Sequence, residues 1–201
     1  MVTDEGLLLG KDLYRTVEAA VKGGVSMVQL REKESSTREF IERAIRLKEV
    51  LTPYGVPLII NDRVDVALAA DADGVHVGQS DMPYEMVKRL LPEGKIIGLS
   101  VESPEQVLEA NDYDLDYVAA SPVFSTTTKT NTIVEWGLDG LRWIRSVSRH
   151  PLVAIGGIHS NNVASIFKAG ADSVAVISAI VSADDPERAA RELLEKSGEP
   201  H

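Results

Sequence analysis

The chain alternates short runs of apolar, mostly β-branched residues with longer stretches in which apolar and polar positions recur at helical spacing. Seven runs have the length and continuous apolar character of buried strands. These predicted strands are Val25–Leu30, Pro57–Ile60, Gly74–Val77, Lys95–Leu99, Asp116–Ala120, Leu152–Ile155 and Ser173–Val176. Strands of this kind, each followed by a helix, indicate a parallel sheet covered by helices.

Helix start signals lie between the strands. Ser36 and Glu39 form a capping box that predicts a helix to about Leu51, and Ser103-Pro104 opens another. The remaining signals predict helices from Pro83 to about Leu90, from a cap at Asn161 or Asn162 to Gly170, and from Asp185-Pro186 to about Leu194.

Counting Met1–Thr3 as the stub of an eighth strand, the pattern gives eight βα units in 201 residues. We therefore predict an α/β fold, a compact TIM (β/α)8 barrel with a short first strand, in which residues 1–201 form a single domain. A doubly wound open sheet is the alternative, but its G-x-G-x-x-G fingerprint after the first strand is missing.

Composition narrows the function classes. The formal charge of −10 argues against general nucleic-acid binding, which needs a basic surface. The absence of Cys excludes disulfides, thiolate zinc sites and a Cys nucleophile. We see no signal peptide and no apolar stretch that would span a bilayer, so we expect a cytoplasmic protein with small-molecule partners. The sequence does not indicate an oligomeric state.

Gln29, Arg31 and Lys33 occupy alternate positions where the first predicted strand runs out. Side chains at alternate strand positions share a face, so these three would point to one spot. Two converging cations repel unless an anion lies between them, and a phosphate or diphosphate suits the donors of Arg and Lys. A solvated strand end with incidental charges is the alternative.

Polar residues follow nearly every other predicted strand as well. Because the active site of a TIM barrel lies at the carboxyl ends of its strands, this recurrence indicates a functional face. The residues are Asn61-Asp62-Arg63, His76 with Gly78-Gln79-Ser80-Asp81, Gly98 with Ser100, Ser121–Lys129, Gly156-Gly157 and Ile177-Ser178.

Asp62 and Asp81 would lie on this face together. Two carboxylates without a counter-charge raise each other's pKa, and a cation between them relieves this. Oxygen ligands near a phosphate favour Mg²⁺, which takes only one or two carboxylates. In the alternative, Asn61-Asp62 caps the helix near Arg63 and Asp81 caps the helix at Pro83.

A second anion site is predicted from two other segments. Ser125–Lys129 places four hydroxyls and a Lys in one loop. Gly156-Gly157 would let backbone N–H groups approach a ligand, and Ile177-Ser178 would begin a short phosphate-binding helix. For His76 we expect a structural role. His159 lies near the predicted phosphate site but would equally cap the next helix.

Together these segments resemble the thiamine phosphate synthase (thiamine-phosphate pyrophosphorylase) family. The segments that carry the resemblance span almost the whole chain in the family's order. They are Gln29-Leu-Arg-Glu-Lys33, Ile60-Asn-Asp-Arg63, Gly74-Val-His-Val-Gly-Gln-Ser-Asp81, Gly98-Leu-Ser100, the Ser-Pro-Val-Phe-Ser-Thr-Thr-Thr-Lys129 loop, Ala154-Ile-Gly-Gly-Ile158 and Ala175-Val-Ile-Ser-Ala179. One departure is at the start of the chain, because the family usually has a longer apolar strand before the Val-Thr-Asp that stands here as Val2-Thr3-Asp4.

The resemblance implies a TIM-barrel transferase that condenses 4-amino-2-methyl-5-hydroxymethylpyrimidine diphosphate with 4-methyl-5-hydroxyethylthiazole phosphate, or its carboxylated form, to thiamine phosphate and diphosphate. It implies a dissociative substitution assisted by Mg²⁺. The roles it implies are pyrimidine recognition by Gln29, diphosphate binding by Arg31, Lys33, Asn61 and Lys129, Mg²⁺ binding by Asp62 and Asp81, a place near the reacting centre for Ser100, and thiazole phosphate binding by Thr126, Thr128, Gly157, Ile177 and Ser178.

Two other functions fit the same scaffold. A thiazole tautomerase, an isomerase of a sister group, needs one phosphate site and a general acid/base. It would not need Arg31, Lys33, Asp62, Asp81 and Lys129 together, so their presence favours the synthase. A non-catalytic sensor of a phosphate ligand would bind without turnover.

Overall fold

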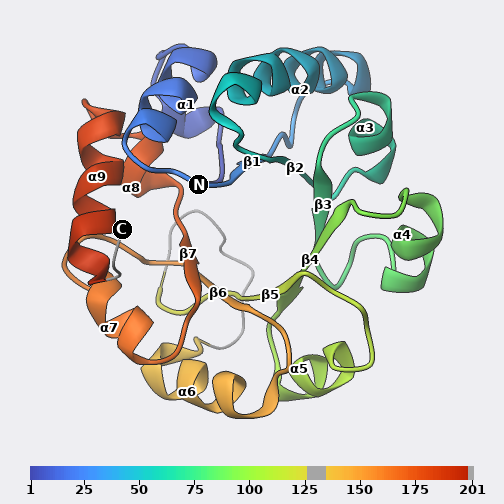
Figure 1. The fold of residues 1–201 in the computed structure, drawn as a ribbon, viewed down its shortest axis with the longest axis vertical. Coiled ribbons are helices and arrows are strands. Elements are labelled where there is room, and N and C mark those ends of the chain that lie inside the picture. Colours follow the sequence, from blue (N-terminus) through green and yellow to red (C-terminus); the bar gives the residue numbers. More distant parts are fainter. Residues whose placement is uncertain (126–134, 199–201) are drawn as a thin grey trace. The chain divides into compact units, whose positions relative to one another are not determined.

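The computed structural model describes residues 1–125 and 135–198. Strands and helices alternate along the chain, as the colours from blue to red show in Figure 1. The strands are β1 Val28–Leu30, β2 Leu58–Asn61, β3 Gly74–Val77, β4 Ile96–Val101, β5 Tyr117–Ala120, β6 Leu152–Ile155 and β7 Ser173–Ala175. Each lies where the apolar pattern predicts a strand, and β3 and β6 have the predicted bounds.

A helix is present at each of the five positions where the start signals predict one. The helices are η1 Gly6–Leu8, α1 Leu13–Lys22, α2 Thr37–Leu51, η2 Thr52–Tyr54, α3 Val64–Ala69, α4 Tyr84–Leu90, α5 Pro104–Ala110, α6 Gly137–Val147, α7 Val163–Lys168, α8 Ser178–Val181 and α9 Pro186–Ser197. The capping box at the start of α2 is confirmed, because the Ser36 hydroxyl accepts from the Glu39 N–H and the Glu39 carboxylate accepts from the Ser36 N–H. Within the described residues no helix is both long and apolar enough to cross a bilayer.

The chain divides into two compact units, the first formed by Met1–Ile96 with Ile177–Glu192 and the second by Ile97–Val176 with Leu193–His201. In the first unit β1, β2 and β3 pair in parallel, with Gln29 beside Ile59 and Asn61 beside His76. Val2 forms an isolated parallel bridge to Gln29. This bridge is the short first strand that the sequence predicts.

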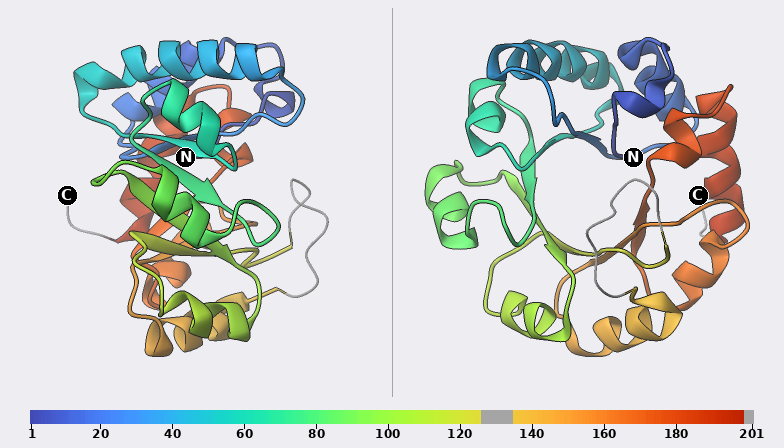
Figure 2. Two further views of the ribbon diagram at one scale, coloured as in Figure 1. Left: turned by 90° about the vertical axis from the view of Figure 1, so that its right-hand side faces the viewer. Right: turned by 180° about the vertical axis from the view of Figure 1, so that it is seen from behind.

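The helices α1, α2 and α3 lie on one side of these three strands in both Figure 1 and Figure 2. The face of α2 turned to the strands is apolar, with Phe40, Ala44, Leu47 and Leu51 all buried. Their spacing of three or four residues is that of an amphipathic helix. Burial of this stripe against β2 fixes the orientation of the helix that follows β1.

In the second unit β4, β5, β6 and β7 pair in parallel in chain order. The register places Ser100 of β4 beside Ala119 of β5 and Ala120 beside Ala154 of β6. All six residues of β4 except the first are buried. Both units therefore consist of parallel strands joined by helices, which is the architecture that the continuous apolar runs predict.

Candidate active site

Lys33 and Asp62 form an ion pair between the segment after β1 and the end of β2. The Lys33 Nζ and an Asp62 carboxylate oxygen are 2.6 Å apart. The Lys33 side chain is 53% exposed and that of Asp62 is 21% exposed. The cation therefore reaches in from solvent toward a carboxylate that is mostly covered.

The backbone at Asp62 is held in an uncommon conformation, with φ 64°. The Arg63 N–H donates to the Asn61 carbonyl at 2.8 Å, which closes a γ-turn centred on Asp62. The Asp62 N–H donates to the His76 carbonyl at 2.8 Å and anchors this turn to β3. A non-glycine residue in the left-handed region costs about 1–3 kcal/mol and persists where its surroundings fix it. The Asp62 side chain carried by this turn interacts with Lys33 and with Asp81.

Asp81 lies in the turn that follows β3, and its carboxylate accepts the Gly78 N–H at 2.8 Å. Burial raises the pKa of Asp81. The neighbouring Asp62 carboxylate raises that pKa further, while the Gly78 N–H and the Lys33 ammonium lower it. The structure thus brings together the two carboxylates that the sequence selected, at the ends of adjacent strands.

The capping alternative for this pair is wrong. The N-cap residue of α3 is Arg63 and that of α4 is Pro83, and neither helix start has a side-chain cap hydrogen bond. Asp62 instead pairs with Lys33, and Asp81 accepts from the turn before it. Both carboxylates are therefore free of the helix-capping role.

The donor set fits a magnesium ion. Two carboxylates that face each other, with an ammonium already drawn to one of them, form a site that attracts a cation. Among residues 1–125 and 135–198, no group of three His, Cys, Asp or Glu side chains gathers closely enough to hold a metal. A pair is sufficient for Mg²⁺, which keeps several waters and uses one or two carboxylates.

Arg31 is held by the segment at the start of the chain. Its guanidinium donates to the Asp4 carboxylate at 2.7 Å, and its N–H donates to the Thr3 hydroxyl at 3.1 Å. The Arg31 side chain is 23% exposed, so its charge remains partly open to solvent. Arg31 and Lys33 thus each pair with a different aspartate, and neither is paired with Glu32, which lies between them in the sequence.

Gln29 and Asn61 occupy the strands that carry these groups. Gln29 is half-buried in β1 and Asn61 is half-buried at the end of β2. His76, beside Asn61, is only 7% exposed within β3, which agrees with the structural role expected for it. The first unit therefore holds Gln29, Arg31, Lys33, Asn61, Asp62 and Asp81, the residues expected for the pyrimidine diphosphate and the metal.

In the second unit Ser100 is 8% exposed in β4. Gly157 has φ 66°, and a Cβ there would lie 2.7 Å from the Phe124 Cβ and 2.8 Å from the Ser125 carbonyl oxygen. Glycine is therefore required by the packing of Gly157 against the start of the predicted anion-binding loop, whatever ligand approaches it. Thr126, Thr128 and Lys129 of that loop lie outside the described residues.

Asn162 occupies the N-cap position of α7, as expected, but does not cap the helix with its side chain. Its carboxamide donates to the Gly157 carbonyl at 2.8 Å and accepts the His159 N–H at 2.9 Å. The predicted cap bond is therefore replaced by two hydrogen bonds to the turn after β6.

In the first unit Ile177 is the N-cap of α8, which begins at Ser178 as the sequence predicts.

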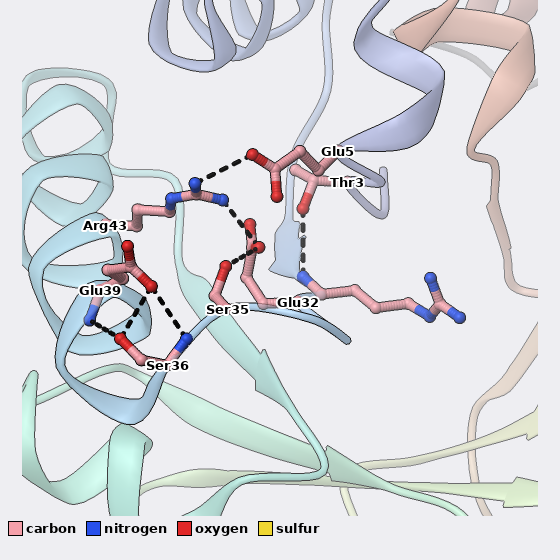
Figure 3. A network of polar contacts seen from close by, with 8 residues as sticks. Thr3, Glu5, Glu32, Ser35, Ser36, Glu39 and Arg43 are labelled. Atoms are coloured by element: carbon pink, nitrogen blue, oxygen red, sulfur yellow. Dashed lines mark hydrogen bonds and ion pairs between the residues drawn. The ribbon is translucent and has the colours of Figure 1, made fainter.

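A network beside Arg31 was not selected from the sequence (Figure 3). The Arg43 guanidinium of α2 donates to Glu32 at 2.8 Å and to Glu5 at 2.9 Å. The Ser35 hydroxyl donates to the same Glu32 oxygen at 2.8 Å. The Glu32 side chain is 3% exposed. The sequence signal that could have drawn attention to Glu32 is its place between Arg31 and Lys33. Once the carboxylate is buried it needs a cationic partner, which Arg43 provides.

The chain is similar to known proteins over most of its length. A family model described as thiamine monophosphate synthase matches residues 1–180. The thiamine-phosphate synthase of Albidiferax ferrireducens is 52% identical over 186 residues, which are 92% of this chain and 85% of the relative. That of Vibrio campbellii is 50% identical over 194 residues, covering 96% of this chain and 95% of the relative.

Among solved structures, thiamine phosphate pyrophosphorylase from Pyrococcus furiosus matches with a TM-score of 0.89 and 41% identity. The match covers 98% of this chain and 93% of that one. With the parallel strand–helix alternation of both units, it confirms the predicted fold class, a TIM-type barrel with a short first strand.

Proposed function

This chain belongs to the thiamine monophosphate synthase family and is a transferase, and we propose that it joins hydroxymethylpyrimidine diphosphate to hydroxyethylthiazole phosphate, or its carboxylated form, with Mg²⁺. The observation that carries the proposal is the Lys33–Asp62–Asp81 cluster with Arg31 close by in the sequence, at the carboxyl ends of adjacent strands. Cations and a carboxylate pair together suit a metal-bound diphosphate.

The reaction breaks the bond between the pyrimidine methylene carbon and the diphosphate oxygen, and both electrons leave with the diphosphate. The lone pair of the thiazole nitrogen then forms the new carbon–nitrogen bond. With the carboxylated thiazole, the carboxylate also leaves as CO2 and a proton from water takes its place on the ring. No proton has to be moved by the protein, so no general base or protein nucleophile is required. This explains a candidate site built from cations and carboxylates rather than from a catalytic histidine.

Arg31 and Lys33 act on the leaving group in this proposal. Negative charge grows on the diphosphate as the bond breaks, and preorganised cations stabilise it more in the transition state than in the ground state. Each cation first has to leave its aspartate, Asp4 for Arg31 and Asp62 for Lys33. These ion pairs hold the side chains extended before the substrate arrives.

Asp62 and Asp81 would hold the Mg²⁺. When bound, the ion would supply positive charge that neutralises the diphosphate oxygens. Lys33, which pairs with Asp62 in the free protein, would turn to the diphosphate. The strained γ-turn at Asp62 serves to direct this carboxylate toward Asp81.

The remaining assignments belong to the same proposal. Gln29 reads the pyrimidine, Asn61 and Lys129 assist with the diphosphate, and Ser100 lies near the reacting carbon. Thiazole phosphate is bound by Thr126, Thr128, Gly157, Ile177 and Ser178. The partners are small molecules rather than nucleic acid, and we place the reaction in the cytoplasm.

The test is to mix the two substrates with MgCl2 and follow thiamine phosphate and diphosphate. We expect both products in equal amounts, and their loss on chelation with restoration by added Mg²⁺. A protein that isomerises the thiazole phosphate but releases no diphosphate is a tautomerase. One that binds both substrates without turnover is a sensor. Either result would overturn the proposal.

A further inference from the structure

Glu32 lies between the two cations assigned to the diphosphate, but its carboxylate contacts Arg43 of α2 and Ser35 of the loop before α2. Its carboxylate accepts from Arg43 and from Ser35, each at 2.8 Å. The side chain is 3% exposed, so water does not compensate its charge. In Figure 3 Glu32 points toward Arg43 and Ser35.

Adjacent side chains of an extended segment point to opposite sides. Arg31 contacts Asp4 and Lys33 contacts Asp62, whereas Glu32 contacts Arg43. By this alternation Arg31 and Lys33 share one side of the segment. The ion pair with Arg43 holds the Glu32 carboxylate on the opposite side.

Arg43 also ties this segment to the start of the chain, because its second nitrogen donates to Glu5 at 2.9 Å. The hydrogen bonds that Arg43 donates to Glu5 and Glu32 raise its pKa above the ordinary value of an arginine. Glu5 follows Asp4, the partner of Arg31. The Arg43 guanidinium therefore holds Glu32, which follows Arg31, and Glu5, which follows Asp4. Contacts to two carboxylates suit the planar fork of Arg better than the single ammonium of Lys.

We propose that Glu32 and Arg43 are positioning residues for the diphosphate-binding cations, Arg43 acting by holding the Glu32 carboxylate away from Arg31 and Lys33. This inference rests on the proposed function, since it assumes that these two cations bind the diphosphate. Without Arg43, Glu32 would be a buried, unpaired carboxylate with two cations next to it in the sequence. It would turn to one of them and neutralise a charge that the substrate needs.

The first test is Arg43→Met. We expect kcat/KM for the pyrimidine diphosphate to fall by about 10- to 100-fold, the range seen when a supporting hydrogen-bond partner is removed. The KM for thiazole phosphate should stay within about twofold, because the group acts only on the diphosphate cations. Arg43→Lys should lie between Arg43→Met and the wild type. Equal rises in both KM values would indicate general loosening and overturn the inference.

The double variant separates positioning from simple structural support. If Arg43 acts by restraining Glu32, adding Glu32→Gln to Arg43→Met removes the released charge. The double variant should then be at least as active as Arg43→Met alone. Activity that falls to the product of the two single effects would mean that the residues act independently, and the inference would be wrong. Should Arg43→Met fail to fold, Arg43→Lys takes its place: it must still lower kcat/KM for the pyrimidine diphosphate selectively, and adding Glu32→Gln must not lower it further.

Two matched controls come from the same region. Glu5→Gln removes the exposed arm of the network, whose side chain is 56% exposed, and should change kcat/KM by less than about threefold. Lys48 lies on the same helix as Arg43 and pairs with Asp71. Lys48→Met breaks this ion pair and should leave both KM values unchanged.

Calorimetry with inorganic diphosphate and MgCl2 keeps this inference apart from the proposed function. Suppose that the wild type makes no thiamine phosphate but binds diphosphate, and that Arg43→Met weakens this binding while Glu5→Gln does not. The proposed function then fails and the positioning role stands. If the wild type is active and Arg43→Met matches it in kinetics and in diphosphate affinity, the function stands and the positioning role is refuted.

Discussion

At the amino ends of three strands an aspartate accepts a hydrogen bond from the backbone of a neighbouring strand, and one of the three, Asp172, also pairs with Arg145. At the carboxyl ends of β2 and β3, Asp62 and Asp81 interact with each other, and Asp62 pairs with Lys33. Asp73, just before β3, accepts the Leu58 N–H at 2.8 Å. In the second unit Asp116 accepts the Ile97 N–H at 2.7 Å and Asp172 accepts the Leu152 N–H at 2.8 Å. The same device recurs before β3, β5 and β7.

The two ends of β3 show the difference within one unit. The Asp73 carboxylate satisfies an N–H at the start of β2 that would otherwise lack a strand partner. Asp81, past the other end, has its pKa raised by burial and by Asp62. Asp73 stabilises the fold through its hydrogen bond, whereas the ionised form of Asp81 destabilises it because folding raises the pKa of that carboxyl. Groups that the fold tolerates rather than needs are expected where binding and catalysis occur.

The comparison is tested most strongly by Asp62→Asn and Asp81→Asn. Each removes a charge from the proposed Mg²⁺ site, so we expect turnover to fall by about 100-fold or more, the scale for losing one preorganised electrostatic group. Neither change should unfold the protein, which circular dichroism would check. Activity that ignores chelators, with both variants near wild type, would remove the metal from the mechanism.

The next test concerns the leaving group. Arg31→Lys keeps the charge but loses the planar fork. We expect kcat to fall by about 10- to 1000-fold with little change in the apparent affinity for the pyrimidine diphosphate. An unchanged kcat with a raised KM would show that Arg31 only docks the substrate.

Most of the fold was predictable because its signals are local. Continuous apolar runs identify β3 and β6 to the residue, and the Ser36–Glu39 box identifies the start of α2. The pairing of Asp62 with Asp81 was also predictable, since parallel strands bring their carboxyl ends to one edge.

Contacts between segments far apart in the sequence could not be predicted in this way. Arg31 pairs with Asp4 across 27 positions, and Arg43 pairs with Glu5 across 38. The positive φ at Asp62 could not be predicted either, because a backbone conformation of this kind is usually adopted by glycine. Asn162 has the right residue type for a helix cap but is drawn to the Gly157 carbonyl, a partner that only the folded chain supplies.

A third prediction addresses the amino ends. Asp73→Ala leaves the Leu58 N–H without its acceptor, so the free energy of unfolding should fall by about 1–3 kcal/mol. Asp73→Asn keeps an acceptor oxygen and should lose less. At temperatures where each variant is folded, kcat should equal that of the wild type. A selective loss of turnover in Asp73→Ala would show that the amino ends also serve the reaction.

The smallest effect expected is a gain in stability. Folding raises the pKa of Asp81, so the folded state prefers the protonated carboxyl, and the ionised form destabilises it at neutral pH. Asp81→Asn should therefore raise the metal-free free energy of unfolding by about 0.5–2 kcal/mol near pH 7, the usual range for relieving a functional strain. The gain should shrink as pH falls through the raised pKa, because the wild-type carboxyl then becomes neutral too. Added Mg²⁺ should reverse the order by stabilising only the wild type. Thermal unfolding with chelator and with MgCl2 measures both effects. If Asp81→Asn is less stable than the wild type under both conditions, Asp81 is a structural residue like Asp73, and the contrast between the two strand ends does not hold there.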